Sequence, residues 1–153
     1  LINYKSYSSL RGLIKWKYQD EVLLEVNQEE NIPGVITGFN KYNEFGIKLN
    51  PLSILFKIPS KKITKEEVFV HSLFEIKDPR TLNLAILFYL KNNLNYKKVL
   101  PVAMKYGKFT LFTNLVSLTK EKQDKIKKQE LPVFDKKDLI EKAKLYNVEV
   151  KDV

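Results

Sequence analysis

The chain has 153 residues, 44% of them hydrophobic, which is enough for a packed core in one domain or in two small ones. It contains no cysteine, which excludes disulfides, thiol catalysis and zinc–thiolate sites and is typical of a reducing compartment. No apolar run reaches the roughly 18 residues of a membrane-spanning helix, and the first residues show no secretion signal. We therefore expect a cytoplasmic protein with no membrane partner.

The positive charge is concentrated in the second half of the chain. The net charge is +9; residues 1–78 carry 11 Lys/Arg and 10 Asp/Glu, whereas residues 79–153 carry 16 and 8. A one-sided field of this kind attracts polyanions, although a lysine-rich solvated surface is the alternative interpretation. Only Arg11 and Arg80 are arginines, and lysine suits phosphates better than base edges. The composition therefore predicts nucleic-acid binding through backbone and shape.

The first third of the chain is rich in short apolar segments separated by polar turns. Residues 10–18 are apolar and basic without a clean period. Apolar and β-branched residues predict strands over 21–26, 34–39, 45–49 and 52–58.

Capping residues predict three helices. Thr64 followed by Glu67 is a capping-box pattern, which predicts a helix over about 65–74. A capping Asp gives two further helices, one over 79–92 after Asp78 and one over 136–146 after Asp135.

The segment 99–112 reads as two apolar runs joined at a Lys-Tyr-Gly-Lys corner, which predicts a strand, a basic turn and a second strand. Residues 115–118 are expected to add a third strand, and 119–129 a lysine-rich helix or arm. Val148–Val150 alternates like a short terminal strand.

These elements predict an α+β or α/β protein in two parts. We expect a small strand-rich N-terminal α/β domain over 1–78. A C-terminal mixed-sheet domain flanked by helices is expected over 79–153, and the boundary falls at 77–79, where the charge balance also shifts.

Metal and cofactor chemistry have little support in the sequence. His71 is the single histidine, it lies beside apolar residues, and a packed or surface histidine is the favoured interpretation. The glycines form no nucleotide-binding loop. Lys105, Tyr106 and Lys108 are close in sequence, but no histidine follows them to complete an acid–base site, so Tyr106 is interpreted as a packing aromatic. We expect no cofactor and no metal.

From Phe45 onward the chain resembles the archaeal tRNA-splicing endonuclease family. The matching features, in order, are Phe45-Gly46, the apolar run 52–56, the helices over 64–74 and 84–90, the motif 99–112 with Lys105-Tyr106-Gly107 as its core, Lys142-Ala143 and 148–150. The resemblance covers about 100 residues and implies the fold of these endonucleases.

The departures from the family pattern imply a subunit that does not catalyse. Active members use Tyr, His and Lys; Phe112 stands at the tyrosine position, and no histidine follows His71. Lys144 or Lys151 falls near the lysine position, but one lysine supplies no acid–base pair. The resemblance therefore implies no catalytic residues in this chain and a structural subunit of a heterodimer or heterotetramer. Its partners would be a catalytic endonuclease subunit and precursor tRNA.

Site residues follow from this reading. The lysines expected to contact RNA are Lys97, Lys98, Lys105, Lys108, Lys120 and Lys122. The segment 147–150 is expected to join a partner by strand addition, with Asn147, Val148 and Val150 at the subunit interface.

Two alternative functions remain open. Residues 34–40 vaguely resemble the Gly-rich stretch of Sm-like RNA-binding proteins, and the nearly neutral charge of the N-terminal half argues against it as the main RNA contact. The other alternative is a structural protein of a large ribonucleoprotein such as the ribosome.

Overall fold

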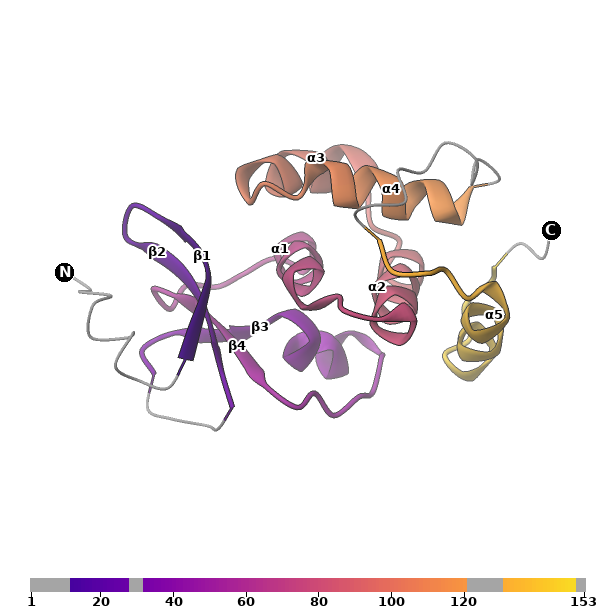
Figure 1. The fold of residues 1–153 in the computed structure, drawn as a ribbon, viewed down its shortest axis with the longest axis horizontal. Helices are drawn as coiled ribbons and strands as arrows, with labels where there is room; N and C mark the ends of the chain where they lie inside the picture. Colours follow the sequence, from indigo (N-terminus) through magenta and orange to yellow (C-terminus); the bar gives the residue numbers. More distant parts are fainter. Residues whose placement is uncertain (1–11, 28–31, 121–130, 151–153) are drawn as a thin grey trace.

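A computed structural model describes residues 12–27, 32–120 and 131–150. They form a mixed α+β fold in which a four-stranded antiparallel sheet lies at one end of the molecule and helices extend away from it (Figure 1). The strands are β1 (Gly12–Tyr18), β2 (Glu21–Val26), β3 (Val35–Thr37) and β4 (Ile54–Ile58). The helices are η1 (Gly38–Phe45), α1 (Lys65–Ser72), η2 (Leu73–Glu75), α2 (Pro79–Lys91), α3 (Tyr96–Lys105), α4 (Phe109–Thr119) and α5 (Lys136–Leu145), of which η1 and η2 are 3₁₀ helices.

The sheet has the strand order β1-β2-β4-β3, and every pairing in it is antiparallel. Successive side chains of a strand point to opposite faces. Leu23 and Leu55 belong to the large core formed with the helices, whereas Val22, Leu24 and Phe56 belong to a second apolar cluster. The helices therefore cover one face of the sheet, and β2 and β4 supply apolar residues to both faces.

The predictions for the first half are confirmed at β2 and, with shorter bounds, at β3 and β4. The strand predicted over 45–49 is wrong. Phe45 ends η1, and Gly46 follows in the left-handed conformation at φ +87°, which turns the chain instead of extending it.

The three predicted helices are confirmed, because the capping residues act as expected. Thr64 Oγ1 accepts from the Glu67 N–H at 3.2 Å, and Glu67 returns a bond to the Thr64 N–H, which completes the capping box of α1. Asp78 caps α2, with Pro79 in the first turn, and Asp135 caps α5.

The strand–turn–strand prediction for residues 99–112 is wrong, and so is the strand over 115–118. Both segments lie in the helices α3 and α4, and Gly107 ends α3 instead of making a hairpin turn. Gly107 has φ +68°, and the N–H of Lys108 bonds to the Ala103 carbonyl at 2.7 Å, which is a Schellman motif. A left-handed glycine serves both a hairpin and a helix C-terminus, so the local signal was ambiguous.

The prediction of a mixed sheet in the C-terminal half is also wrong. Residues 79–120 and 131–150 contain helices and connecting segments but no strand. The terminal strand predicted over 148–150 is replaced by a second Schellman motif, in which Asn147 has φ +56° and the Val148 N–H bonds to the Ala143 carbonyl at 2.8 Å. The lysine-rich segment 119–129 falls almost wholly outside the described residues.

One apolar core continues across the boundary predicted at 77–79. It includes Leu23 and Leu55 from the sheet together with Phe88 and Phe112 from α2 and α4. Among the described residues, none of the helices is both long and apolar enough to cross a lipid bilayer.

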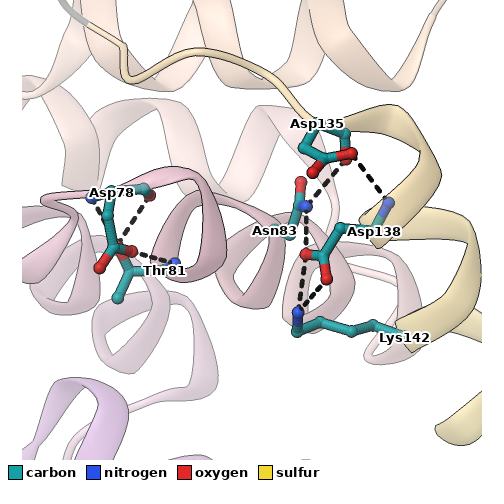
Figure 2. A network of polar contacts seen from close by, with 6 residues as sticks. All are labelled: Asp78, Thr81, Asn83, Asp135, Asp138 and Lys142. Atoms are coloured by element: carbon teal, nitrogen blue, oxygen red, sulfur yellow. Dashed lines mark hydrogen bonds and ion pairs between the residues drawn. The ribbon is translucent and has the colours of Figure 1, made fainter.

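A polar network attaches α5 to α2 (Figure 2). The Asn83 side chain donates to the Asp135 carbonyl at 3.0 Å and to Asp138 Oδ2 at 2.8 Å. Lys142 pairs with the same Asp138 carboxylate at 2.6 Å. Burial alone would raise the pKa of Asp138, but the hydrogen bonds from Lys142 and Asn83 outweigh it and hold that pKa below the ordinary value. Since Asn83 is fully buried, these bonds fix how α5 lies on α2.

Candidate nucleic-acid interface

The solvent side of α3 brings together three of the six lysines predicted to contact RNA. Lys97, Lys98 and Lys105 are exposed, and Pro101 and Met104 lie among them on the same exposed side. Positions with these spacings form one stripe on an α-helix, because a turn takes 3.6 residues. We call this stripe the α3 lysine face.

The segment that contains this face is free of acidic residues. Between residues 79 and 120 the sequence has seven basic residues and no Asp or Glu: Arg80, Lys91, Lys97, Lys98, Lys105, Lys108 and Lys120. The excess charge of the second half therefore arises almost wholly in α2, α3 and α4. The positive potential is concentrated there instead of being spread over the C-terminal half.

The remaining lysines of the prediction have different surroundings. Lys108 lies over the Phe74 ring at 4.3 Å, and Lys120 is exposed at the end of α4. Lys122 lies outside the described residues. Lys97, Lys98 and Lys105 are thus the predicted residues that the fold places on one face.

Two aromatic side chains are exposed close to these lysines. Tyr96, at the start of α3, is 38% exposed and stacks on the buried Phe112 with ring centroids 5.2 Å apart. Phe109, at the start of α4, is 47% exposed. Exposed rings beside lysines are the combination on which unpaired bases stack.

Phe112 itself is a core residue. It is fully buried and also contacts the rings of Phe69 and Tyr89, each at 6.0 Å. The interpretation of Phe112 as the end of a strand beside a vacant active site is therefore wrong in its local structure.

At the end of α3, Lys105 enters a cluster of ion pairs with the sheet. Glu21 accepts from Lys105 at 3.0 Å and from Lys57 at 3.2 Å, and Lys57 is only 3% exposed. Burial alone would raise the pKa of Glu21, but the Lys105 hydrogen bond and the charge of Lys57 outweigh it and lower the pKa. These pairs fix the end of α3 against the sheet, so Lys105 is less available to a ligand than Lys97 and Lys98.

His71 lies buried behind this cluster. Its Nδ1 shares a 2.7 Å hydrogen bond with Thr37 Oγ1, and its ring meets Tyr106 edge-on at 4.7 Å. Burial, assisted by the charges of Lys57 and Lys105, lowers the pKa of His71 to about 3, so the ring is neutral at pH 7. Of the two predicted interpretations, a packed or a surface histidine, this position agrees with the packed one.

Two polar atoms of this region are left without partners. His71 Nε2 and the Tyr106 hydroxyl are buried and have no hydrogen bond within the described residues. Tyr106 packs on Trp16 at 4.4 Å, and burial raises its pKa above the ordinary value. A neutral imidazole and a neutral phenol deep in the fold are poorly placed to exchange protons with a substrate.

A groove of about 520 Å³ separates α3 from the start of α1. Lys98, Lys105 and Tyr106 line it on one side, and Glu66 and Glu67 line it on the other. The two glutamates repel phosphate from the groove itself. A polyanion would therefore contact the outer part of the α3 lysine face, around Lys97 and Lys98.

The residues predicted at a subunit interface lie at the end of α5. Asn147 is exposed, whereas Val148 and Val150 are partly buried and pack against the core. This packing differs from the free strand edge that strand addition requires.

Glu21, Lys57 and Tyr96 are neighbours of the α3 lysines that the sequence did not predict. Lys57 lies 48 residues before Lys105, and no local pattern joins them. The sequence does contain one signal for this surface, namely the absence of acidic residues over 79–120.

The described residues contain no group of three or more His, Asp or Glu side chains that could hold a metal ion. Comparisons with known proteins add no assignment to this geometry. No family model matches the chain, and neither the curated proteins nor the solved structures include a significant match.

Proposed function

We propose that this protein binds single-stranded nucleic acid, RNA in particular, through its phosphate backbone. The observation that carries the proposal is the α3 lysine face, set in a segment of 42 residues, 79–120, that has seven basic residues and no acidic one. Lysine contacts phosphates as a point charge, so the binding would depend little on base sequence. Tyr96 and Phe109 would add stacking with unpaired bases.

The test compares two adjacent pairs of exposed lysines. Lys97→Gln/Lys98→Gln changes the α3 lysine face, and Lys61→Gln/Lys62→Gln removes the same charge from the loop before α1. Binding to a fluorescent single-stranded RNA is measured between about 50 and 200 mM salt, where phosphate contacts weaken strongly. The first variant is expected to bind about tenfold more weakly and to reduce the salt slope by roughly 1–2.

The matched control decides whether position or total charge matters. The Lys61/Lys62 variant is expected to bind nearly as wild type. Equal weakening by both variants, or an affinity that does not change with salt, would contradict the α3 lysine face as the site. Phe109→Ala tests the stacking part, with a smaller loss expected for single strands than for the lysine pair and no loss for a duplex.

A more specific proposal is a structural, noncatalytic subunit of a tRNA-splicing endonuclease. Its support is the sequence resemblance from Phe45 onward, and this support is weaker over 99–112, where the chain is helical. The test mixes the protein with a catalytic subunit and an intron-bearing tRNA. Cleavage by this chain alone, or no association with the catalytic subunit, would refute the role.

A further inference from the structure

A second polar site lies at the opposite end of the helix-covered face of the sheet from Lys105. It is a cavity of about 550 Å³, a volume within the usual range of small-ligand sites. Strands β1 and β2, the loop 49–53, η2 and the start of α2 surround it. Apolar side chains such as Phe39, Phe74 and Leu84 line part of the wall.

The Glu75 carboxyl group belongs to this cavity, and the backbone makes room for it. Its Oε1 accepts from the Phe39 N–H at 3.0 Å. Gly38 stands beside it at φ +66°, and a Cβ at that position would collide with Oε1. The space left by the glycine and the Phe39 N–H together hold Oε1 in place, while Oε2 has no hydrogen-bond partner among the described residues.

The charges that face Glu75 do not neutralise it. Lys15 forms its ion pair with Glu25, at 3.9 Å, and not with Glu75. No cation among the described residues lies within 4 Å of the Glu75 carboxyl group. Burial raises the pKa of Glu75 to about 8; Glu25 adds to this effect, and the Phe39 N–H, Lys15 and Lys77 oppose it. A buried carboxylate normally has a cation, so a cation that enters the cavity would find an unfilled position.

The rim of the cavity carries the opposite charge. Lys77 and Arg80 are exposed and line the cavity beside Asp78, whose carboxylate is occupied as the cap of α2. An anionic group at the rim would meet these two cations. A ligand suited to both parts carries a cation at one end and an anion at the other.

We propose that this cavity binds a small zwitterion, a free basic amino acid in chemical class, whose guanidinium or ammonium group pairs with Glu75 while its carboxylate lies toward Lys77 and Arg80. The planar fork of a guanidinium suits a carboxylate best, so arginine is the preferred probe. This site is separate from the α3 lysine face and does not depend on nucleic-acid binding.

The experiment titrates the full chain with L-arginine and with agmatine, which lacks the carboxylate, by calorimetry at pH 8. Glu75→Gln keeps the size of the side chain and the acceptor for the Phe39 N–H, and it is expected to weaken binding of both probes at least about tenfold. Arg80→Ala is expected to weaken arginine binding and to leave agmatine binding unchanged. Glu149→Gln removes an exposed carboxylate elsewhere and serves as the matched control.

The pH dependence gives a second readout. Below pH 8 a cation must displace the proton of Glu75, so the affinity is expected to rise about tenfold per pH unit and to level off above pH 8. The same measurements detect binding of GMP or inorganic phosphate, which would place an anion rather than a cation in the site.

Three results would overturn the proposal. They are equal binding by wild type and Glu75→Gln, no binding of either amine up to about 10 mM by folded protein, and saturation by GMP or phosphate alone. Circular dichroism of each variant distinguishes a lost site from a lost fold. Failure of this site would leave the RNA titrations unaffected.

Discussion

Each end of the helix-covered face of the sheet contains a carboxyl group, and the pKa is shifted in opposite directions at the two ends. At the start of β2, Glu21 has two lysines within 3.2 Å, and its pKa is lowered. At the other end, Glu75 has within the described part of the chain a single backbone N–H as partner and no cation within 4 Å, and its pKa is raised to about 8. Glu75 is also buried more deeply than Glu21, so the depth of burial and the supply of cations together account for the opposite shifts.

This difference indicates distinct tasks for the two ends. A carboxylate with both of its cations present holds β2, β4 and α3 together and gains nothing from a ligand. A carboxyl group that is held by a backbone N–H but has no cation beside it is costly to ionise in a buried position, and a cationic ligand can offset this cost. The second arrangement is the one expected at a binding site.

The largest expected effect comes from breaking the paired end. Glu21→Gln leaves Lys57, which is 3% exposed, without its counter-charge, and we expect a loss of about 3 kcal/mol in the free energy of unfolding at pH 7. Urea denaturation measures it. Glu44→Gln removes the exposed pair with Lys41 and is expected to cost less than about 1 kcal/mol. Similar losses in both variants would mean that Lys57 does not depend on Glu21.

The second prediction isolates His71, which lies behind the paired end. In the folded protein it stays neutral down to about pH 3, whereas in the unfolded chain it protonates near pH 6.5, so acid favours unfolding. In a Glu75→Gln background, lowering the pH from 6.5 to 4.5 is expected to cost about 2.3 kcal/mol. Adding His71→Gln should remove most of this slope in pH-dependent urea denaturation. Unchanged slopes would show that His71 is protonated in the folded state.

The smallest effect concerns the unpaired end. Glu75 holds its proton up to about pH 8, but in the unfolded chain it ionises near pH 4.5, so a rise in pH favours unfolding within this window. Between pH 4.5 and 6.5 His71 opposes the effect. From pH 6.5 to 8 we expect wild type to lose about 2 kcal/mol relative to Glu75→Gln, measured by thermal or urea denaturation. Parallel curves for the two proteins would contradict the raised pKa.

The sequence allowed prediction of those elements whose signals are local. The caps Thr64, Asp78 and Asp135 mark helix starts because their side chains bond within three residues. The segment around Gly107 failed because Val, Phe and Thr favour strands, while the packing of Val99 and Phe112 into the core favours helices. Tertiary contacts decided what local propensity could not.

The candidate sites show the same limit. The α3 lysines were predicted from charge, which does not depend on whether the segment is helix or strand. Glu75 was not predicted, because its contacts with Gly38 and with the Phe39 N–H join segments that lie 36 residues apart in the chain. A contact of this kind follows from the fold and has no trace in the local pattern.

Gly107 has a consequence for the shape of the surface around the α3 lysine face. It contributes no side chain, and a Cβ there would meet nothing within 4 Å, yet its φ of +68° sets the direction in which α4 leaves α3. The angle between the lysines of one helix and Phe109 on the next is thus encoded by a residue that would touch no ligand. Gly107→Ala would change the geometry of the surface while preserving every charge on it.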